Sequence, residues 1–139
     1  MAQNTYNARV LVLRKTKLGE SDLILSLLAQ DGSQIRAVAK GARKPSSQFS
    51  SRLELYSQAD VLLAQGRSLD IAKEARLVAG NAALRASMEL AACAAPIVEL
   101  LDRITQPGLE VPRLFPLTQT ALDVLASAGS AHGPAICAA

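Results

Sequence analysis

The densest cluster of chemically active side chains lies in the segment RAVAKGARKPSSQFSSRLEL, residues 36–55. It carries five cations against a single acid, Glu54. The cations are Arg36, Lys40, Arg43, Lys44 and Arg52. Lysine, arginine and small hydroxyl side chains are the usual protein contacts to phosphate oxygens. The segment therefore predicts binding to a polyanion rather than a reaction.

The spacing of these cations suits an extended backbone. On a strand over residues 33–42, Arg36 and Lys40 face the same side, about 13 Å apart at roughly 3.3 Å per residue. That separation is of the order of two phosphate steps. Gly41 is expected to let a phosphate approach the backbone closely. Three cations near the end of the first predicted strand widen the same patch: Arg14, Lys15 and Lys17. The alternative is a solvated cationic loop that only maintains solubility.

Catalysis needs reactive groups in sets, and the chain has few of them. His132 is the single histidine, so a triad or a histidine-based metal site is not easily built. Cys93 and Cys137 make no four-cysteine zinc set, and we expect Cys93 to be a buried, inert thiol in a reducing cytoplasm. Glu20 and Asp22, in Gly-Glu-Ser-Asp, are interpreted as turn residues rather than a catalytic pair. We expect no enzyme activity, no cofactor and no metal.

The net charge of +3 is unevenly distributed along the chain. Residues 1–80 hold 12 Lys and Arg against 7 Asp and Glu, whereas residues 81–139 hold 3 against 5. The first part is therefore basic by +5 and the second acidic by −2, which predicts a polyanionic partner for the first part. No apolar run approaches the length of a membrane span, so we expect a cytoplasmic protein without membrane contact.

The element pattern changes at Gly80. Before it, five apolar runs separated by glycine or Asp-Gly predict strands over residues 5–15, 23–30, 33–42, 53–65 and 68–79. Five short strands favour a small closed barrel of the OB-fold type, because closure removes exposed edges. For residues 23–30, the hydrophobic periodicity alone does not distinguish a strand from a buried helix. We assign residues 1–80 to a nucleic-acid-binding domain and 81–139 to a partial helical domain.

Two helices are predicted after this boundary. One spans residues 81–104, with Asn81 as its N-cap and a kink or break at Pro96. The other spans about 113–128, with Gly129 as its stop. The residues expected to face inward are Leu84, Met88, Ala91, Ala95, Val98 and Leu101 in the first helix, and Leu117, Ala121, Leu122 and Leu125 in the second. Two helices cannot cover each other completely, so we expect them to dock on the barrel or to be covered by a partner or by further chain.

The composition also bears on the kind of nucleic acid. A small barrel with mobile basic loops suits single strands, but base stacking needs aromatic side chains. Only four are present: Tyr6, Phe49, Tyr56 and Phe115. Binding should therefore depend on phosphates, tolerate any sequence and weaken with salt.

Residues 11–55 resemble the N-terminal region of the RecO family of DNA repair proteins. The likeness rests on Leu13-Arg14, on Gly-Glu-Ser-Asp at 19–22, on Gly32 and, most specifically, on VAKGARKPSSQF at 38–49 followed by Leu53. It extends over most of residues 6–80, and more loosely to ELLDRI at 99–104.

The resemblance implies a recombination mediator with an OB-fold domain followed by a helical domain. Such proteins bind single- and double-stranded DNA, anneal complementary strands, and act with RecR and the single-strand-binding protein SSB to load RecA. The family's basic DNA-contacting loop falls on Lys40, Arg43 and Lys44, with Arg14 and Arg52 as neighbours. Together with the strand argument, the candidate set is Arg14, Lys15, Arg36, Lys40, Arg43, Lys44 and Arg52.

Other interpretations stay open at this point. One is an adaptor that docks SSB through its apolar helical face and binds little DNA itself. Another is an RNA-binding barrel that acts in translation, for which the sequence contains no supporting motif. Family members usually continue through more helices, and many carry a four-cysteine zinc-binding segment, so a fragment, a frameshifted product and a short variant are all open explanations of these 139 residues.

Overall fold

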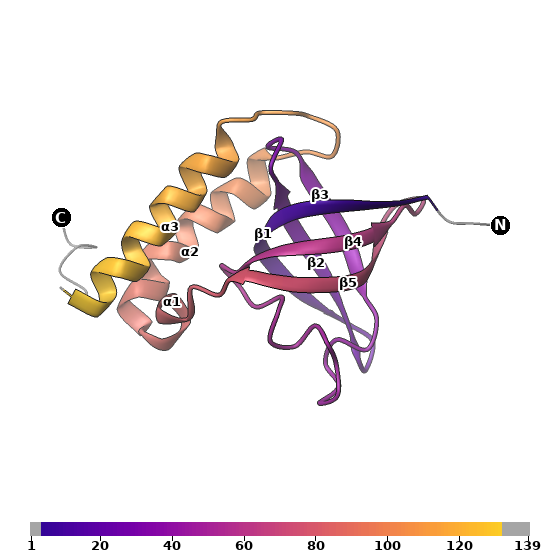
Figure 1. Cartoon of the computed structure of the whole chain (residues 1–139), viewed down its shortest axis with the longest axis horizontal. Helices are drawn as coiled ribbons and strands as arrows, with labels where there is room; N and C mark the ends of the chain where they lie inside the picture. The colour runs from indigo at the N-terminus through magenta and orange to yellow at the C-terminus, as the bar shows by residue number, and fades with distance from the viewer. Residues whose placement is uncertain (1–3, 132–139) are drawn as a thin grey trace.

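A computed structural model describes residues 4–131 of the chain. Its five strands are β1 (Thr5–Leu18), β2 (Asp22–Ala29), β3 (Gln34–Ala39), β4 (Gln58–Ala64) and β5 (Asp70–Ala79). They form a closed barrel in the order β1-β2-β3-β5-β4, in which β1 also pairs with β4 (Figure 1). Every pairing is antiparallel except that of β3 with β5. The predicted five-stranded OB-fold barrel followed by helices is confirmed.

Residues 23–30, for which the sequence allowed either a strand or a helix, fall in strand β2, since the backbone of β2 pairs with β1 on one side and β3 on the other. The strand expected over 53–65 is shorter than predicted and covers only Gln58–Ala64. Residues 40–57 instead form a long loop between β3 and β4, which extends beyond the barrel at the bottom of Figure 1. This loop still supplies core residues, because Phe49 and Leu53 are buried inside the barrel cluster.

The apolar residues of β1 contribute to two hydrophobic cores, one inside the barrel and one between the barrel and the helices. Val10 and Val12 point into the barrel, whereas Leu11 and Leu13 face outward and pack under the helices. Leu28 of β2 joins them in this second core. Burial on both faces explains why β1 reads as a continuous apolar stretch rather than an alternating one.

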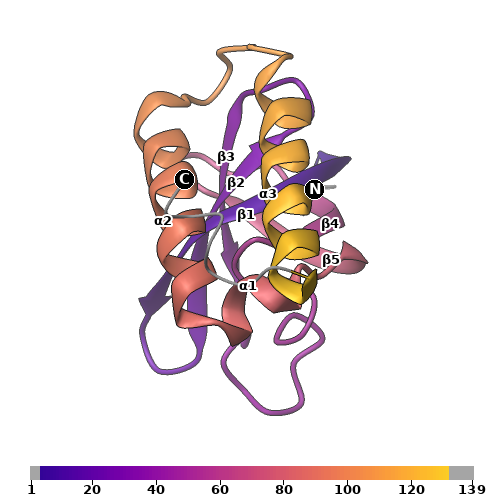
Figure 2. The ribbon, with the colours of Figure 1, turned by 90° about the vertical axis from the view of Figure 1, so that its left-hand side faces the viewer.

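Three helices follow the barrel: α1 (Ala82–Ala86), α2 (Met88–Ile104) and α3 (Leu114–Ala131). Figures 1 and 2 show α2 and α3 running side by side over one flank of the barrel. Their buried side chains include Leu90, Ala94, Val98 and Leu122, which contact the outward leucines of β1 and β2. The helices therefore dock on the barrel.

Several helix details differ from the sequence prediction. The first helix breaks at Ser87, not at Pro96, and the Ser87 side chain accepts a hydrogen bond from the Leu90 N–H. Asn81 occupies the N-cap position of α1 as predicted, but its side chain makes no capping hydrogen bond; it adopts a left-handed φ of 49° and donates its side-chain amide to the Tyr56 carbonyl. Gly129 does not stop α3.

The break at Ser87 also explains why the prediction of the inward-facing residues was partly wrong. A stripe drawn through one continuous helix loses its phase when the helix restarts. Met88 is consequently 88% exposed, and the buried positions of α2 are Leu90, Ala94, Val98 and Leu101. In α3, Leu122 is buried as expected, but Leu117 is 65% exposed.

Two further points concern cysteine and membranes. Cys93 is half-buried on α2 rather than fully buried, and it is not a free thiol, which corrects the expected inert thiol. His132 and Cys137 lie outside the described residues. Among the helices in the described part of the chain, none has both the length and the apolarity to span a bilayer.

Candidate nucleic-acid interface

The predicted cations gather mainly around one end of the barrel, where the β1–β2 turn meets the start of the β3–β4 loop. Three backbone and side-chain hydrogen bonds join these two segments, so residues 19–22 and 41–43 lie together. We call the set Lys15, Lys17, Lys40, Arg43 and Lys44 the basic end.

Strand β3 presents its side chains as its sequence predicted. Ala37 and Ala39 are buried in the barrel, whereas Arg36 is exposed on the outer face. The strand ends at Ala39, so Lys40 is the first residue of the loop. Strand register places Arg36 opposite Ser26, and Ser26 opposite Arg14, in one row across three strands.

A hollow of about 470 Å³ opens at the basic end. Lys15, Lys17 and Arg43 line it together with Ser50 and one acid, Glu54. Lys17 was expected to widen the patch but lies outside the predicted set of seven cations, although its position two residues after Lys15 on a strand puts both side chains on one face. Three cations against one carboxylate leave a net positive charge around this hollow, which is chemically suited to phosphate oxygens.

The cations of the candidate set differ in how far they are neutralised. Lys15 Nζ lies 3.1 Å from Glu54 Oε1, and Arg14 Nη1 lies 3.5 Å from Asp102 Oδ2 on α2. Within the described residues, by contrast, no carboxylate oxygen lies within 4.0 Å of the charged nitrogens of Arg36, Lys40, Arg43, Lys44 or Arg52. These five cations therefore keep uncompensated charge.

Two of the uncompensated arginines are nevertheless held in place. Arg43 Nη1 donates to the Gly19 carbonyl at 3.0 Å, and Arg52 Nη1 donates to the Ala75 carbonyl at 3.1 Å. A guanidinium has five N–H groups, so donors remain for a ligand. A backbone carbonyl fixes the side chain without cancelling its charge.

Gly41 does not have the role expected for it. Its N–H donates to Asp22 Oδ1 at 2.8 Å, so this amide is not available to a phosphate. Residues 19–21 form the turn between β1 and β2, and Asp22, the first residue of β2, reaches across to the basic loop. The sequence could not reveal this contact, because 19 residues separate its two partners.

The aromatic side chains offer little surface for base stacking. Phe49, Tyr56 and Phe115 are buried, with at most 7% of their surface exposed. Tyr6 is partly buried at the far end of the barrel, where its hydroxyl donates to Asp70 and burial raises its pKa. Contacts to DNA at the basic end would then be made to the phosphate backbone.

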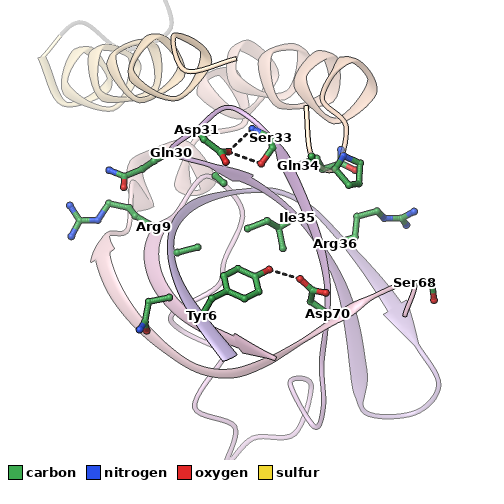
Figure 3. A pocket seen from close by; sticks show the side chains of 15 residues that line it. Tyr6, Arg9, Gln30, Asp31, Ser33, Gln34, Ile35, Arg36, Ser68 and Asp70 are labelled. Atoms are coloured by element: carbon green, nitrogen blue, oxygen red, sulfur yellow. Dashed lines mark hydrogen bonds between the residues drawn. The ribbon is translucent and has the colours of Figure 1, made fainter. Parts of the chain in front are cut away.

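The far end of the barrel carries a second hollow, of about 530 Å³, which is less suited to a polyanion. Figure 3 shows Arg9 and Arg36 pointing away from it, and Tyr6 and Asp70 pointing toward each other. Asp31 accepts hydrogen bonds from the backbone and the hydroxyl of Ser33. Acids line this hollow and its arginines turn outward, so we do not assign it to DNA. Within residues 4–131, no three metal-ligating side chains gather into a metal site.

Residues 1–81 match the family described as recombination protein O, N-terminal. The chain belongs to the RecO family. The matched part contains the complete RecO-type barrel and all seven predicted cations.

Curated RecO proteins are similar over nearly the whole chain. A DNA repair protein RecO of Bifidobacterium longum is 40% identical over 131 residues, which are 93% of this chain and 54% of the relative. One from Cutibacterium acnes is 39% identical over 94% of this chain and 53% of the relative. One from Desulfitobacterium hafniense is 37% identical over 88% and 45%, respectively. The chain thus spans about half the length of the RecO relatives it matches, and the similarity includes the helices.

Proposed function

We propose that this chain is a DNA-binding module of recombinational DNA repair that anneals complementary single strands. It binds single- and double-stranded DNA through phosphates at the basic end, with Arg36 and Arg52 extending the contact. The observation that carries this proposal is the cluster of Lys17, Lys40, Arg43 and Lys44 at one end of an OB-fold barrel of the RecO family. None of these four cations has a carboxylate partner among the described residues. Arg14 and Lys15 contribute less, because Asp102 and Glu54 compete with phosphate for them.

Annealing requires that the repulsion between two polyanions be reduced while their bases stay free to pair. Lysine and arginine contacts to phosphate do this, and they release condensed counterions as they form. Strong stacking of bases on aromatic rings would oppose pairing. The burial of Phe49, Tyr56 and Phe115 therefore suits annealing better than tight storage of single strands.

The proposal also covers the domain roles, the cellular location and the partners of this module. Residues 1–80 act as the DNA-binding domain and residues 81–139 as a partial helical domain. In the cytoplasm, where bacterial DNA lies, the module assists recombinase loading together with SSB and RecR. No catalytic residue and no cofactor take part, since annealing needs neutralised charge rather than a nucleophile.

The test is the rate at which complementary oligonucleotides anneal. Replacing three cations at once (Lys40→Ala, Arg43→Ala and Lys44→Ala) should slow annealing by at least tenfold, since each phosphate contact adds to affinity. The matched control replaces three exposed cations that share no hollow with the basic end: Arg67→Ala, Arg76→Ala and Arg113→Ala. It lowers the net charge equally and should retain most of the rate. Equal rates for both triple variants would refute the assigned surface.

An adaptor function is the second candidate, because α2 and α3 expose apolar side chains. Leu100 is 58% exposed, Leu117 65% and Val124 54%. Under this alternative the helices bind SSB, and DNA binding is weak and insensitive to the Lys40, Arg43 and Lys44 substitutions. A clear complex with SSB combined with such insensitivity would favour the adaptor.

A further inference from the structure

The β1–β2 turn is tied to the basic loop through Asp22. Its Oδ1 atom accepts a hydrogen bond from the Gly41 N–H at 2.8 Å and another from the Ser21 hydroxyl at 3.3 Å. Asp22 is the first residue of β2 and pairs with Leu18 across the hairpin. The carboxylate is thus mounted on a paired strand, which gives it a fixed position.

Two more hydrogen bonds run between the same segments. The Arg43 N–H donates to the Ser21 carbonyl at 2.9 Å, and Arg43 Nη1 donates to the Gly19 carbonyl at 3.0 Å. The turn therefore holds the loop at both Gly41 and Arg43, at the rim of the hollow that Arg43 and Lys17 line.

The loop needs such a clamp because its backbone reverses at Gly41. Gly41 has a φ of 69°, in the left-handed region that glycine adopts most readily. The Lys44 N–H closes the turn by donating to the Gly41 carbonyl at 3.0 Å. Ala42 is buried in the barrel core, whereas Lys40 and Lys44 on either side are exposed. With its backbone held inward, the loop directs its two lysines outward.

We propose that Asp22 is a positioning residue for DNA binding: it holds the Lys40–Lys44 loop in the shape that presents the lysines to phosphate. This inference rests on the proposed DNA-binding function. It runs against simple electrostatics, because a carboxylate beside a phosphate site repels the ligand and its removal should strengthen binding. The two effects of Asp22 therefore predict opposite changes in DNA affinity for Asp22→Ala: loss of the positioning contact weakens binding, and loss of the negative charge strengthens it.

The experiment compares three variants of the full chain by fluorescence anisotropy with a labelled single-stranded oligonucleotide. Asp22→Ala removes both the charge and the acceptor for the Gly41 N–H, whereas Asp22→Asn removes the charge and keeps an acceptor oxygen. Asp31→Ala is the matched control. It removes an aspartate that also caps a turn, but at the opposite end of β2.

We expect Asp22→Ala to bind about tenfold more weakly than the unaltered chain, which is about 1.4 kcal/mol. Asp22→Asn should bind as well as the unaltered chain or better, and Asp31→Ala within about twofold of it. If Asp22→Ala binds as tightly as the unaltered chain, the positioning role is wrong. If the unaltered chain shows no salt-dependent binding, the proposed function itself fails.

Hydrogen exchange gives a second test, and its measurement on the unaltered chain does not depend on the folding of any variant. The Gly41 amide should exchange slowly, like the paired amides of β2, because Asp22 accepts its hydrogen. In Asp22→Asn its protection should be largely retained. Rapid exchange of the Gly41 amide in the unaltered chain would show that the clamp does not form, and would overturn the proposal.

Discussion

Asp60 on β4 receives hydrogen bonds from two arginines on neighbouring strands. Arg9 Nε and Nη2 donate to its carboxylate at 2.8 and 3.1 Å, and Arg76 Nη2 donates at 2.9 Å. These hydrogen bonds, chiefly those from Arg9, lower the pKa of Asp60 from 3.8 to about 2. The ionised carboxylate thus joins β1, β4 and β5 on the outside of the barrel.

This ion pair predicts a pH-dependent stability. Since the pKa is lower in the folded state, the stabilisation is complete above about pH 4 and is lost as the pH falls toward 2. Asp60→Asn should lower the free energy of unfolding at pH 7 by about 1 kcal/mol, a value reduced for the exposure of the arginines. Urea unfolding at pH 7 and at pH 2 measures it, and the difference from the unaltered chain should shrink at pH 2. Asp123→Asn, an exposed residue of α3, serves as control. An equal effect of both substitutions at pH 7 would contradict this account.

Glu54 restrains two cations near the proposed DNA-binding surface. Its carboxylate lies 3.1 Å from Lys15 Nζ and 3.9 Å from Arg85 Nε. Glu54→Gln should free Lys15 for phosphate, strengthening DNA binding a few-fold and steepening log K against log[salt] by about 0.7 for single strands. Binding titrations between about 50 and 200 mM salt provide the measurement. The control is Glu74→Gln, which removes an exposed acid that forms no ion pair among the described residues. Unchanged affinity and slope for Glu54→Gln would show that Lys15 does not contact DNA.

At the scale of elements, the β2–β3 turn packs directly against the segment between α2 and α3. Gly32 has a φ of 84°, and a Cβ atom added there would lie 1.8 Å from the Val111 carbonyl oxygen. The Gln34 N–H donates to the Gln106 carbonyl beside it, and the Gln34 side chain donates to the Asp102 carbonyl. This junction fixes the helices on the barrel.

The junction makes Gly32→Ala a sharp test of helix docking. The substitution combines an unfavourable φ with a clash against backbone. Gly108→Ala is matched to it, since Gly108 has a φ of 78° and nothing within 4 Å of an added Cβ. Gly108→Ala should cost about 1–2 kcal/mol from its backbone conformation alone, and Gly32→Ala about 2 kcal/mol more. Thermal and urea unfolding measure both. Equal losses would mean that the Gly32–Val111 contact does not hold the helices.

The sequence predicted those features that depend on neighbouring residues, and it missed those that depend on contacts between distant residues. The outward placement of Arg36 followed from strand alternation. The position of the helix break did not, because the prediction relied on Pro96, whereas the register of α2 depends on its packing against Leu11 and Leu13. The Asp22–Gly41 hydrogen bond was equally hidden, since it joins residues that no local pattern relates.

At the scale of the whole molecule, the distribution of charge matches the arrangement of the fold. The basic residues 1–80 form the barrel, and the acidic residues 81–131 include the helices on its flank (Figure 2). One acid from the helices, Asp102, reaches the barrel and pairs with Arg14. The composition alone predicted a basic half and a polyanionic partner. It could not predict which cations would be neutralised, because that depends on tertiary contacts: Asp102 pairs with Arg14 when the helices dock, and Glu54 of the β3–β4 loop pairs with Lys15.

The most direct test of the central claim is the salt dependence of DNA binding. Four to six phosphate contacts predict a slope of about −3 to −4 for log K against log[salt] with a single-stranded oligonucleotide, from roughly −0.7 per contact. The combined Lys40→Ala, Arg43→Ala and Lys44→Ala variant should flatten that slope by about 2. A flat response of the unaltered chain, or an unchanged slope in the variant, would contradict binding at the basic end.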